Sequence, residues 1–163
     1  MNIDNSHKYY FFWKGPLSQW KTSFFTENDI QYCCAEQYMM HKKALLFDDE
    51  ETANAIMNTS IPSEHQDLGR QVKNFKQSIW DEHAREIVYT GNMLKFKQNP
   101  RLLEILLATG DKILVEASPY DCIWGIGLDQ EAANRLPASE WLGKNWLGEV
   151  LNQVKKDLSQ QLE

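Results

Sequence analysis

The chain has 163 residues, of which 42% are hydrophobic and 25% charged, and this suits one ordinary globular domain rather than a disordered segment. Its formal net charge of −6 disfavours a general nucleic-acid binder, which usually carries a basic face, but allows a small anionic ligand held by a local Arg or Lys cluster. Because no apolar run reaches the roughly 18 residues of a transmembrane helix and no secretory signal is evident, we expect a reduced, cytoplasmic protein with no membrane partner and no disulfide framework.

The first third of the chain predicts two short strands followed by a helix. Aromatic residues 9–13 predict a strand that ends at the Gly15-Pro16 turn. Residues 30–33 predict a second strand, which we expect to pair with the first as a hairpin-like unit. A helix should follow over residues 35–47.

Short helices are expected next. Asp48 and Asp49 should end the first helix, and either can cap another over residues 50–58. Pro62 is typical of the first position of a helix, which we expect to be interrupted at Gly69-Arg70.

A longer helix is predicted over residues 78–98, with Ser78 as its cap. Gly91 inside it indicates either a close helix contact or a break. Five residues outline its expected buried side: Ile79, His83, Ile87, Leu94 and Phe96.

The C-terminal third predicts a helix over residues 101–108, a strand over 112–117 and a loop over 118–127. Polar residues 128–140 should form an exposed loop, and an amphipathic helix should begin near Gly143. The predicted fold is therefore α+β and mainly helical with a few short strands, in a single domain over residues 1–163 whose core spans about 9–158.

The helix expected over residues 35–47 carries an acid and an amine on one side. Glu36 and Lys43 are seven residues apart, close to two helical turns, so they project in the same direction. A lysine near a helix end is usually solvated. If its amine is partly buried beside Glu36, its pKa can be tuned for proton transfer or for an imine with a sugar aldehyde.

Other chemistry has weaker support. The four histidines do not pair with cysteines or carboxylates at a zinc-type spacing, so we predict no metal site. No Walker A loop or dinucleotide fingerprint is present, and Gly125-Ile126-Gly127 indicates only a tight turn. Cys33 and Cys34 lie at a helix start, where a thiolate is favoured, but buried small residues are the simpler interpretation.

An acid and an aromatic residue follow the strand predicted over residues 112–117. Glu116 lies at its end, and Asp121 and Trp124 lie in the next loop, where functional residues often concentrate. A carboxylate can stabilise an oxocarbenium-like transition state, and an indole can stack on a base. A capping Asp and a core Trp would explain the same pattern.

An ordered set of segments resembles the NADAR (NAD and ADP-ribose) superfamily, which includes the swarming-motility-associated N-glycosidase of bacteria. The resemblance extends from about residue 9 to 158, and no single piece carries it alone. The matching segments include Phe12-Trp13, Gln19-Trp20, Ala35-Glu36-Gln37-Tyr38, Lys43-Ala44, Leu68-Gly69-Arg70, Trp80, Leu114-Val115-Glu116, Asp121, Trp124-Gly125 and Asn145.

The resemblance implies hydrolysis of N-glycosidic bonds without a cofactor. One branch of the family cleaves phosphoribosylamino-pyrimidine intermediates of riboflavin biosynthesis, which releases ribose 5-phosphate. Another branch removes ADP-ribose from guanine in nucleic acid. The acidic net charge favours a small phosphoribosyl substrate over ADP-ribosylated nucleic acid. A third alternative is a non-catalytic module that binds ADP-ribose or a related nucleotide. Nothing in the sequence indicates an oligomeric state.

The resemblance also implies roles for individual residues. Lys43 would attack the anomeric carbon or capture it as an imine, and Glu36, with Glu116 or Asp121, would move protons. The implied substrate-binding residues are Trp20, Arg70, Trp80, Trp124 and Asn145, with Arg70 on the phosphate and Trp80 or Trp124 on the base. Gln19 departs from the usual Asn, and Lys155 from a common Arg, which leaves the fine structure of the substrate open.

Overall fold

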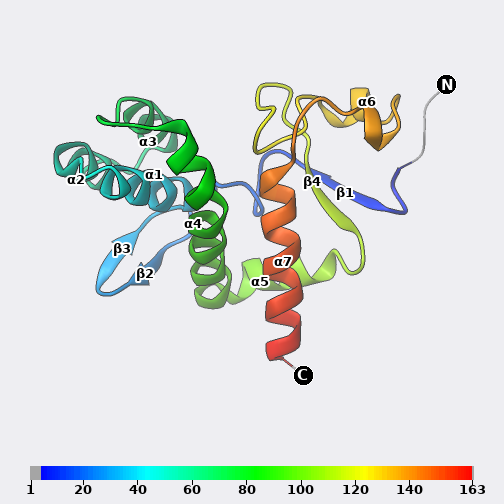
Figure 1. Ribbon diagram of the computed structural model, residues 1–163. Coiled ribbons are helices and arrows are strands. Elements are labelled where there is room, and N and C mark those ends of the chain that lie inside the picture. The colour runs from blue at the N-terminus through cyan, green and yellow to red at the C-terminus, as the bar shows by residue number, and fades with distance from the viewer. Residues whose placement is uncertain (1–4, 163) are drawn as a thin grey trace. The chain divides into compact units, whose positions relative to one another are not determined.

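The structure of the chain is a computed structural model that describes residues 5–162 (Figure 1). Residues 1–4 lie outside the described part, so the structure does not bear on the start of the segment in which we expect no secretory signal. Contacts divide the described chain into two compact units. The central unit runs from Gln19 to Pro100, and the terminal unit combines the segment that ends at Ser18 with the segment that begins at Arg101. The predicted α+β, mainly helical character is confirmed.

The terminal unit contains a two-stranded parallel sheet. Strand β1 (Tyr9–Phe12) pairs with β4 (Ile113–Glu116), with Tyr9 opposite Ile113 and Phe12 opposite Glu116. The predicted pairing of residues 9–13 with residues 30–33 is therefore wrong. Parallel strands need a long crossover connection, and here the whole central unit lies in sequence between the two strands.

The second sheet is a hairpin of β2 (Phe25–Glu27) and β3 (Ile30–Tyr32) in the central unit. Its two turn residues, Asn28 and Asp29, have φ angles of 50° and 68°. Two successive left-handed residues match the right-handed twist of the flanking strands, and Asn and Asp tolerate this conformation. The partner of residues 30–33 is therefore the adjacent aromatic segment rather than the first strand.

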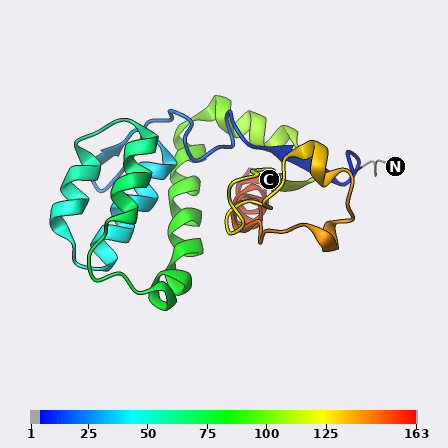
Figure 2. The same cartoon turned by 90° about the horizontal axis from the view of Figure 1, so that it is seen from above.

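Helix α1 (Ala35–Leu46) lies at the centre of its unit and contacts α2 (Glu50–Met57), α3 (Pro62–Arg70) and α4 (Gln77–Gln98). Figure 2 shows these four helices grouped together, as seen from above. Aspartates separate α1 from α2 as predicted: Asp48 has a φ of 56°, and Asp49 caps α2 by accepting a hydrogen bond from Thr52 N. α3 begins at Pro62 as predicted but continues through Gly69. The glycine permits close packing there, because a Cβ would collide with Met40 of α1.

The long helix α4 differs from its prediction in cap and buried side. It begins at Gln77, and Ser78 is not its cap. Most of the predicted buried side is one residue out of register, because the true stripe includes small and polar residues that a hydrophobic pattern does not select. Of the two alternatives for Gly91, the structure has the close contact rather than the break, since a Cβ would lie 2.6 Å from the Tyr38 ring of α1. The buried stripe consists of Trp80, Ala84, Val88, Gly91, Asn92, Lys95 and Phe96.

The rest of the terminal unit is helical or irregular. Helix α5 (Pro100–Ala108) leads into β4, and α7 (Trp146–Gln161) packs against β4 through its apolar side (Figure 1). The expected exposed loop over residues 128–140 instead contains α6 (Gln130–Ala133) and a 3-10 turn at Ala138–Glu140, because Asp129 caps α6 and Ala133 is buried. None of the helices in the described part is long and apolar enough to span a membrane.

Candidate functional site

The start of α1 fixes the position of Glu36. Cys34 caps the helix, since its Sγ accepts a hydrogen bond from Gln37 N. Glu36 lies in the first turn, where the helix dipole favours a negative charge, and its backbone N donates to Gln19 O at 2.9 Å. Only 4% of Glu36 is exposed. The fold thus holds a carboxylate in a buried setting at a helix N-terminus.

Lys43 lies near the other end of α1 and is half-buried. Its Nζ is 4.6 Å from the ring centre of Phe75 and 5.4 Å from that of Trp80. Burial lowers the pKa of Lys43; the negative charge of Glu36 opposes this shift, and the positive charge of Arg70 adds to it. A lysine with a lowered pKa carries more free amine near neutral pH than an ordinary lysine does.

The two aromatic rings beside Lys43 differ in exposure. Trp80, from the first turn of α4, is buried, whereas Phe75, from the segment before α4, is 38% exposed and packs edge-on against Phe47 at 5.3 Å. Both rings can stabilise the ammonium form of Lys43 through cation–π contacts. Sequence reasoning missed Phe75, because it lies between helices, where neither helical nor strand spacing marks it.

Arg70 and Trp20 are accessible members of the same unit. Arg70 ends α3, its side chain is 70% exposed, and its ion pair with Asp67 is loose at 3.8 Å. Its guanidinium can therefore reach an anion in solution. Trp20 is also exposed, and it follows Gln19, whose Oε1 accepts a hydrogen bond from buried Asn92 at 2.8 Å. The longer side chain of Gln19 is thus used for a hydrogen bond to Asn92 inside the protein.

Asp121 organises the loop after β4 in the terminal unit. Its Oδ1 accepts hydrogen bonds from the backbone N of Ile123 and of Trp124, both at 2.9 Å. Trp124 in turn packs edge-on against Trp146, the first residue of α7, with ring centres 5.5 Å apart. Both predicted residues thus have structural contacts in the described chain.

Asn145 connects the start of α7 to β4. Its Oδ1 accepts from Glu116 N at 2.9 Å, and its Nδ2 donates to Leu114 O at 3.1 Å. Its backbone is left-handed, with a φ of 55°. Gly148 permits this close approach, because a Cβ there would collide with Leu114 O and the Asn145 amide. Asn145 therefore fixes the backbone beside Glu116.

The predicted site residues thus fall into two sets, one in each unit. The central unit holds Glu36, Lys43, Trp80, Arg70 and Trp20, and the charges of Glu36 and Arg70 shift the pKa of Lys43 in opposite directions. The terminal unit holds the other four: Glu116, Asp121, Trp124 and Asn145.

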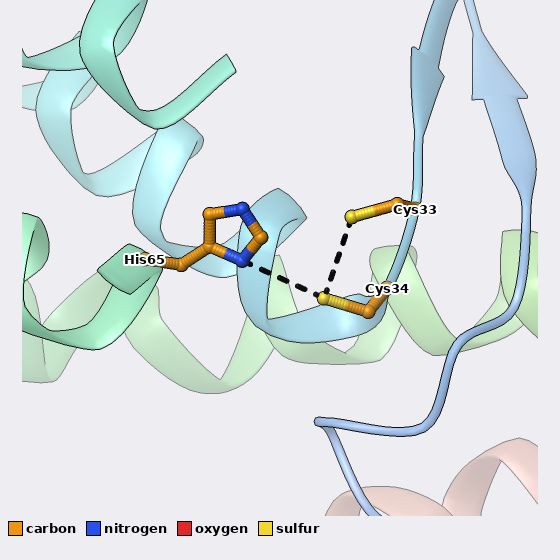
Figure 3. Close-up of side chains that lie close together, drawn as sticks. All are labelled: Cys33, Cys34 and His65. Atoms are coloured by element: carbon orange, nitrogen blue, oxygen red, sulfur yellow. Dashed lines mark hydrogen bonds between the residues drawn. The ribbon is translucent and has the colours of Figure 1, made fainter. Parts of the chain in front are cut away.

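A separate group of possible metal ligands lies near the start of α1. Among the described residues, the side chains of Cys33, Cys34 and His65 place their ligand atoms within 4.8 Å of one another (Figure 3). Spacing along the sequence did not indicate this group, because His65 lies on α3, about 30 residues after the cysteines.

Comparisons with known proteins identify a domain family and several relatives of the chain. Residues 10–159 match the NADAR domain. The chain is 49% identical over 134 residues to an N-glycosidase of Acanthamoeba polyphaga mimivirus, with 82% of this chain and 79% of that protein covered. It is 28% identical over 130 residues to a chloroplastic riboflavin biosynthesis protein of Zea mays, with 76% of this chain but only 19% of that protein covered.

The fold has a solved counterpart in the NMR structure of the Escherichia coli protein YbiA. The TM-score is 0.78 at 24% sequence identity, and the match covers 96% of this chain and 88% of that chain. The family match spans both compact units. The prediction of an enzyme of the N-glycosidase class is confirmed, and the chain belongs to the NADAR domain family.

Proposed function

We propose that this protein hydrolyses the N-glycosidic bond of phosphoribosylamino-pyrimidine intermediates of riboflavin biosynthesis and releases ribose 5-phosphate. The observation that carries the proposal is the half-buried amine of Lys43, with its lowered pKa, beside two aromatic rings and the carboxylate of Glu36. Relatives named as an N-glycosidase and as a riboflavin biosynthesis protein support the reaction and the substrate class.

Lys43 acts as the nucleophile in this mechanism. Its neutral Nζ forms a bond to ribose C1′ while the C1′–N bond to the base breaks, and the base nitrogen leaves with the bonding pair and takes up a proton. Loss of the proton from Nζ and opening of the ribose ring give an imine. Water then hydrolyses the imine to ribose 5-phosphate and the free amine.

Glu36 acts as the proton carrier. The nitrogen of Lys43 must lose a proton after it bonds to C1′, and a carboxylate on the same stripe of α1 can accept it. Its negative charge also stabilises the positive charge that develops on the sugar. Burial strengthens both effects, because the local dielectric is lower than that of water.

Substrate binding is assigned to residues around Lys43. The exposed guanidinium of Arg70 binds the 5′-phosphate, because its planar donors match phosphate oxygens. Exposed Trp20 and Phe75 offer ring faces to the pyrimidine, and Phe75 is an addition to the residues expected from sequence. Trp80 contributes a buried aromatic ring next to the amine of Lys43.

The family resemblance assigns further roles to the terminal unit, and these stay predictions. Glu116 and Asp121 are proposed as additional proton carriers, and Trp124 as a surface for the base. The contacts of Asn145 with the backbone of β4 support a role in holding Glu116 in place rather than direct contact with substrate.

Borohydride trapping tests the nucleophile. Borohydride reduces an imine to a stable secondary amine, so wild-type protein treated during turnover should gain the mass of a reduced phosphoribosyl group on Lys43. Lys43→Met should gain none. Lys42→Met is the matched control, because Lys42 is the next residue on α1 and pairs with Glu27 at 2.6 Å. Trapping on Lys42, or unchanged turnover by Lys43→Met, would contradict the mechanism.

A product assay tests the substrate. Release of ribose 5-phosphate from the riboflavin intermediates, with no release of ADP-ribose from ADP-ribosylated guanine, is the expected result. The opposite pattern would assign the chain to ADP-ribosyl hydrolysis. Binding of these ligands without turnover by folded protein would support a binding module instead.

A further inference from the structure

Two cysteines and a histidine meet where β3 leads into α1. Cys33 follows β3, Cys34 caps α1, and His65 lies on α3 (Figure 3). The two sulfur atoms are 3.9 Å apart, and Cys34 Sγ is 3.7 Å from His65 Nδ1. The three side chains come from elements that α1 holds together, so the fold itself maintains the group.

These separations match the edges of a metal tetrahedron. With Zn–S bonds of about 2.3 Å and Zn–N bonds of about 2.0 Å, a tetrahedral Zn²⁺ ion separates two sulfur ligands by about 3.8 Å and a sulfur from a nitrogen by about 3.5 Å. The two separations that involve Cys34 Sγ exceed these values by only 0.1–0.2 Å, and the remaining separation, between Cys33 Sγ and His65, lies within 4.8 Å. One ion can therefore contact Cys34 and His65 as they lie, and a rotation of the half-buried Cys33 side chain brings its sulfur to the same ion.

His65 presents the correct nitrogen. Its Nε2 lies 2.7 Å from the carbonyl oxygen of Thr59, and a carbonyl only accepts hydrogen bonds, so Nε2 carries the proton. Nδ1 then has a free lone pair, and this is the atom that faces Cys34. A backbone carbonyl on the second nitrogen is the usual support for a metal-binding histidine.

The surroundings of Cys34 favour a bound thiolate over a free reactive one. Cys34 is 1% exposed, so a thiolate without a compensating charge would be costly there, and a bound cation supplies that charge. Gln37 N, at the N-terminus of α1, also donates a hydrogen bond to this sulfur and favours the thiolate once a cation displaces the proton.

We propose that Cys33, Cys34 and His65 form a binding site for Zn²⁺ or a similar thiophilic divalent cation that fixes the start of α1 to α3. Binding replaces the two thiol protons, which pass to solvent, so the two thiolates balance the charge of the ion. Cys33 is half-buried, which leaves the fourth position to water from the surface. This proposal departs from the expectation, based on sequence spacing, that the chain has no metal site.

Cobalt substitution tests the site in the intact protein under a phosphine reductant. Metal-free protein titrated with Co²⁺ should develop a thiolate-to-cobalt charge-transfer band and the visible bands of tetrahedral Co²⁺, saturating at about one ion per chain. Zn²⁺ should abolish these bands, release about two protons per ion in weak buffer and raise the midpoint of thermal unfolding.

Matched variants distinguish this group from other thiols. Cys122→Ser, which removes the exposed cysteine outside the group, should bind as the wild type does. Cys33→Ser should weaken Zn²⁺ binding at least tenfold and reduce the charge-transfer band; since Cys33 is only half-buried, this variant should fold. His65→Gln should lose the tetrahedral visible bands, with circular dichroism as the check on folding.

Three results would overturn the proposal. They are no charge-transfer band in folded wild-type protein, the same affinity in Cys33→Ser as in the wild type, and loss of binding in Cys122→Ser. None of these readouts depends on catalysis, so the proposed N-glycosidase mechanism and the metal site can fail separately.

Discussion

The two units treat their polar residues differently. In the central unit, Glu36 is almost fully buried, and Lys43 is half-buried with a lowered pKa. In the terminal unit, the polar side chains of Asp121 and Asn145 accept hydrogen bonds from nearby backbone groups, and the Asn145 amide also donates one.

This difference favours the central unit as the location of the proposed chemistry. Burying a charge costs free energy that a neutral side chain would not cost, so Glu36 and Lys43 are poor choices for stability alone. The hydrogen bonds of Asp121 and Asn145 hold a turn and a strand, so stability alone can account for them. The case for catalysis is therefore stronger in the central unit.

The largest expected effect is the loss of turnover in Glu36→Gln. The substitution keeps the shape of the side chain but removes its ability to accept a proton, so kcat should fall by roughly 10²–10⁴-fold. The free energy of unfolding should fall, because the favourable interactions of this charge with Lys43 and with the N-terminus of α1 are lost. Steady-state kinetics and urea denaturation measure the two quantities on the same preparation.

A matched control makes this test specific. Glu27→Gln removes another carboxylate of the central unit, which pairs with Lys42 and accepts a hydrogen bond from Tyr38 at 2.9 Å. This variant should lower the free energy of unfolding only slightly, since a partly exposed pair contributes only about 1 kcal/mol. Its kcat should stay within about twofold of the wild-type value. Equal losses of kcat in both variants would remove the special status of Glu36.

The next largest effect is expected in the terminal unit, on stability. Asn145→Ala deletes both hydrogen bonds to β4 and leaves a left-handed residue without the tolerance of Asn for that conformation. We expect a loss of about 1–3 kcal/mol in the free energy of unfolding, measured with urea.

Asn145→Gly separates the causes of that loss. Glycine relieves the left-handed strain but not the missing hydrogen bonds, so it should recover only part of the stability. Full recovery would show that backbone strain, rather than the contact with β4, determines the effect.

Sequence patterns predicted the elements of this fold better than their partners. The strand over 112–117 and the Pro62 helix start are local features, and they are confirmed, because turn residues and short-range periodicity determine them. The partner of β1 could not be predicted, since β4 lies about 100 residues away in the chain. The buried side of α4 was misplaced because Asn92 is buried through hydrogen bonds to Gln19 and Val88, which hydrophobicity does not reveal.

The candidate site could be predicted in the same limited sense. Helical spacing alone placed Glu36 and Lys43 on one side of α1, and the structure connects them electrostatically. Phe75 and His65 could not be found, because each reaches its partners through tertiary packing rather than through spacing along the chain. Sequence reasoning therefore detects pairs within one element and misses groups assembled from several.

A smaller effect on activity is expected from Asp121→Asn. Asparagine keeps the Oδ1 acceptor that holds the turn, so the thermal midpoint should stay unchanged, while the negative charge is lost. If Asp121 moves protons, kcat should fall by about tenfold, below the loss from Glu36→Gln. An unchanged kcat would restrict Asp121 to its structural role and sharpen the difference between the two units.

The smallest effect concerns the pH dependence of kcat. Because burial lowers the pKa of Lys43, the neutral amine forms at a lower pH than in an ordinary lysine, and kcat should rise with pH as the ammonium loses its proton. The positive charge of Arg70 also lowers this pKa, so Arg70→Gln should raise it and move the rising limb of the profile to higher pH. Because Arg70 is largely exposed and screened, the change at a fixed pH should stay below about fivefold, equivalent to about 1 kcal/mol.

The direction of this shift separates two roles of Arg70. Loss of a phosphate contact raises KM and leaves the pH profile of kcat in place at saturating substrate, whereas loss of the nearby charge moves the profile. Arg101→Gln, which removes an exposed arginine of the terminal unit, controls for the change in net charge. A limb that moves to lower pH, or that moves equally in Arg101→Gln, would contradict the electrostatic connection between Arg70 and Lys43. Partial activity of Glu36→Gln offers the opposite test: since the charge of Glu36 raises the pKa of Lys43, its removal should move the limb to lower pH.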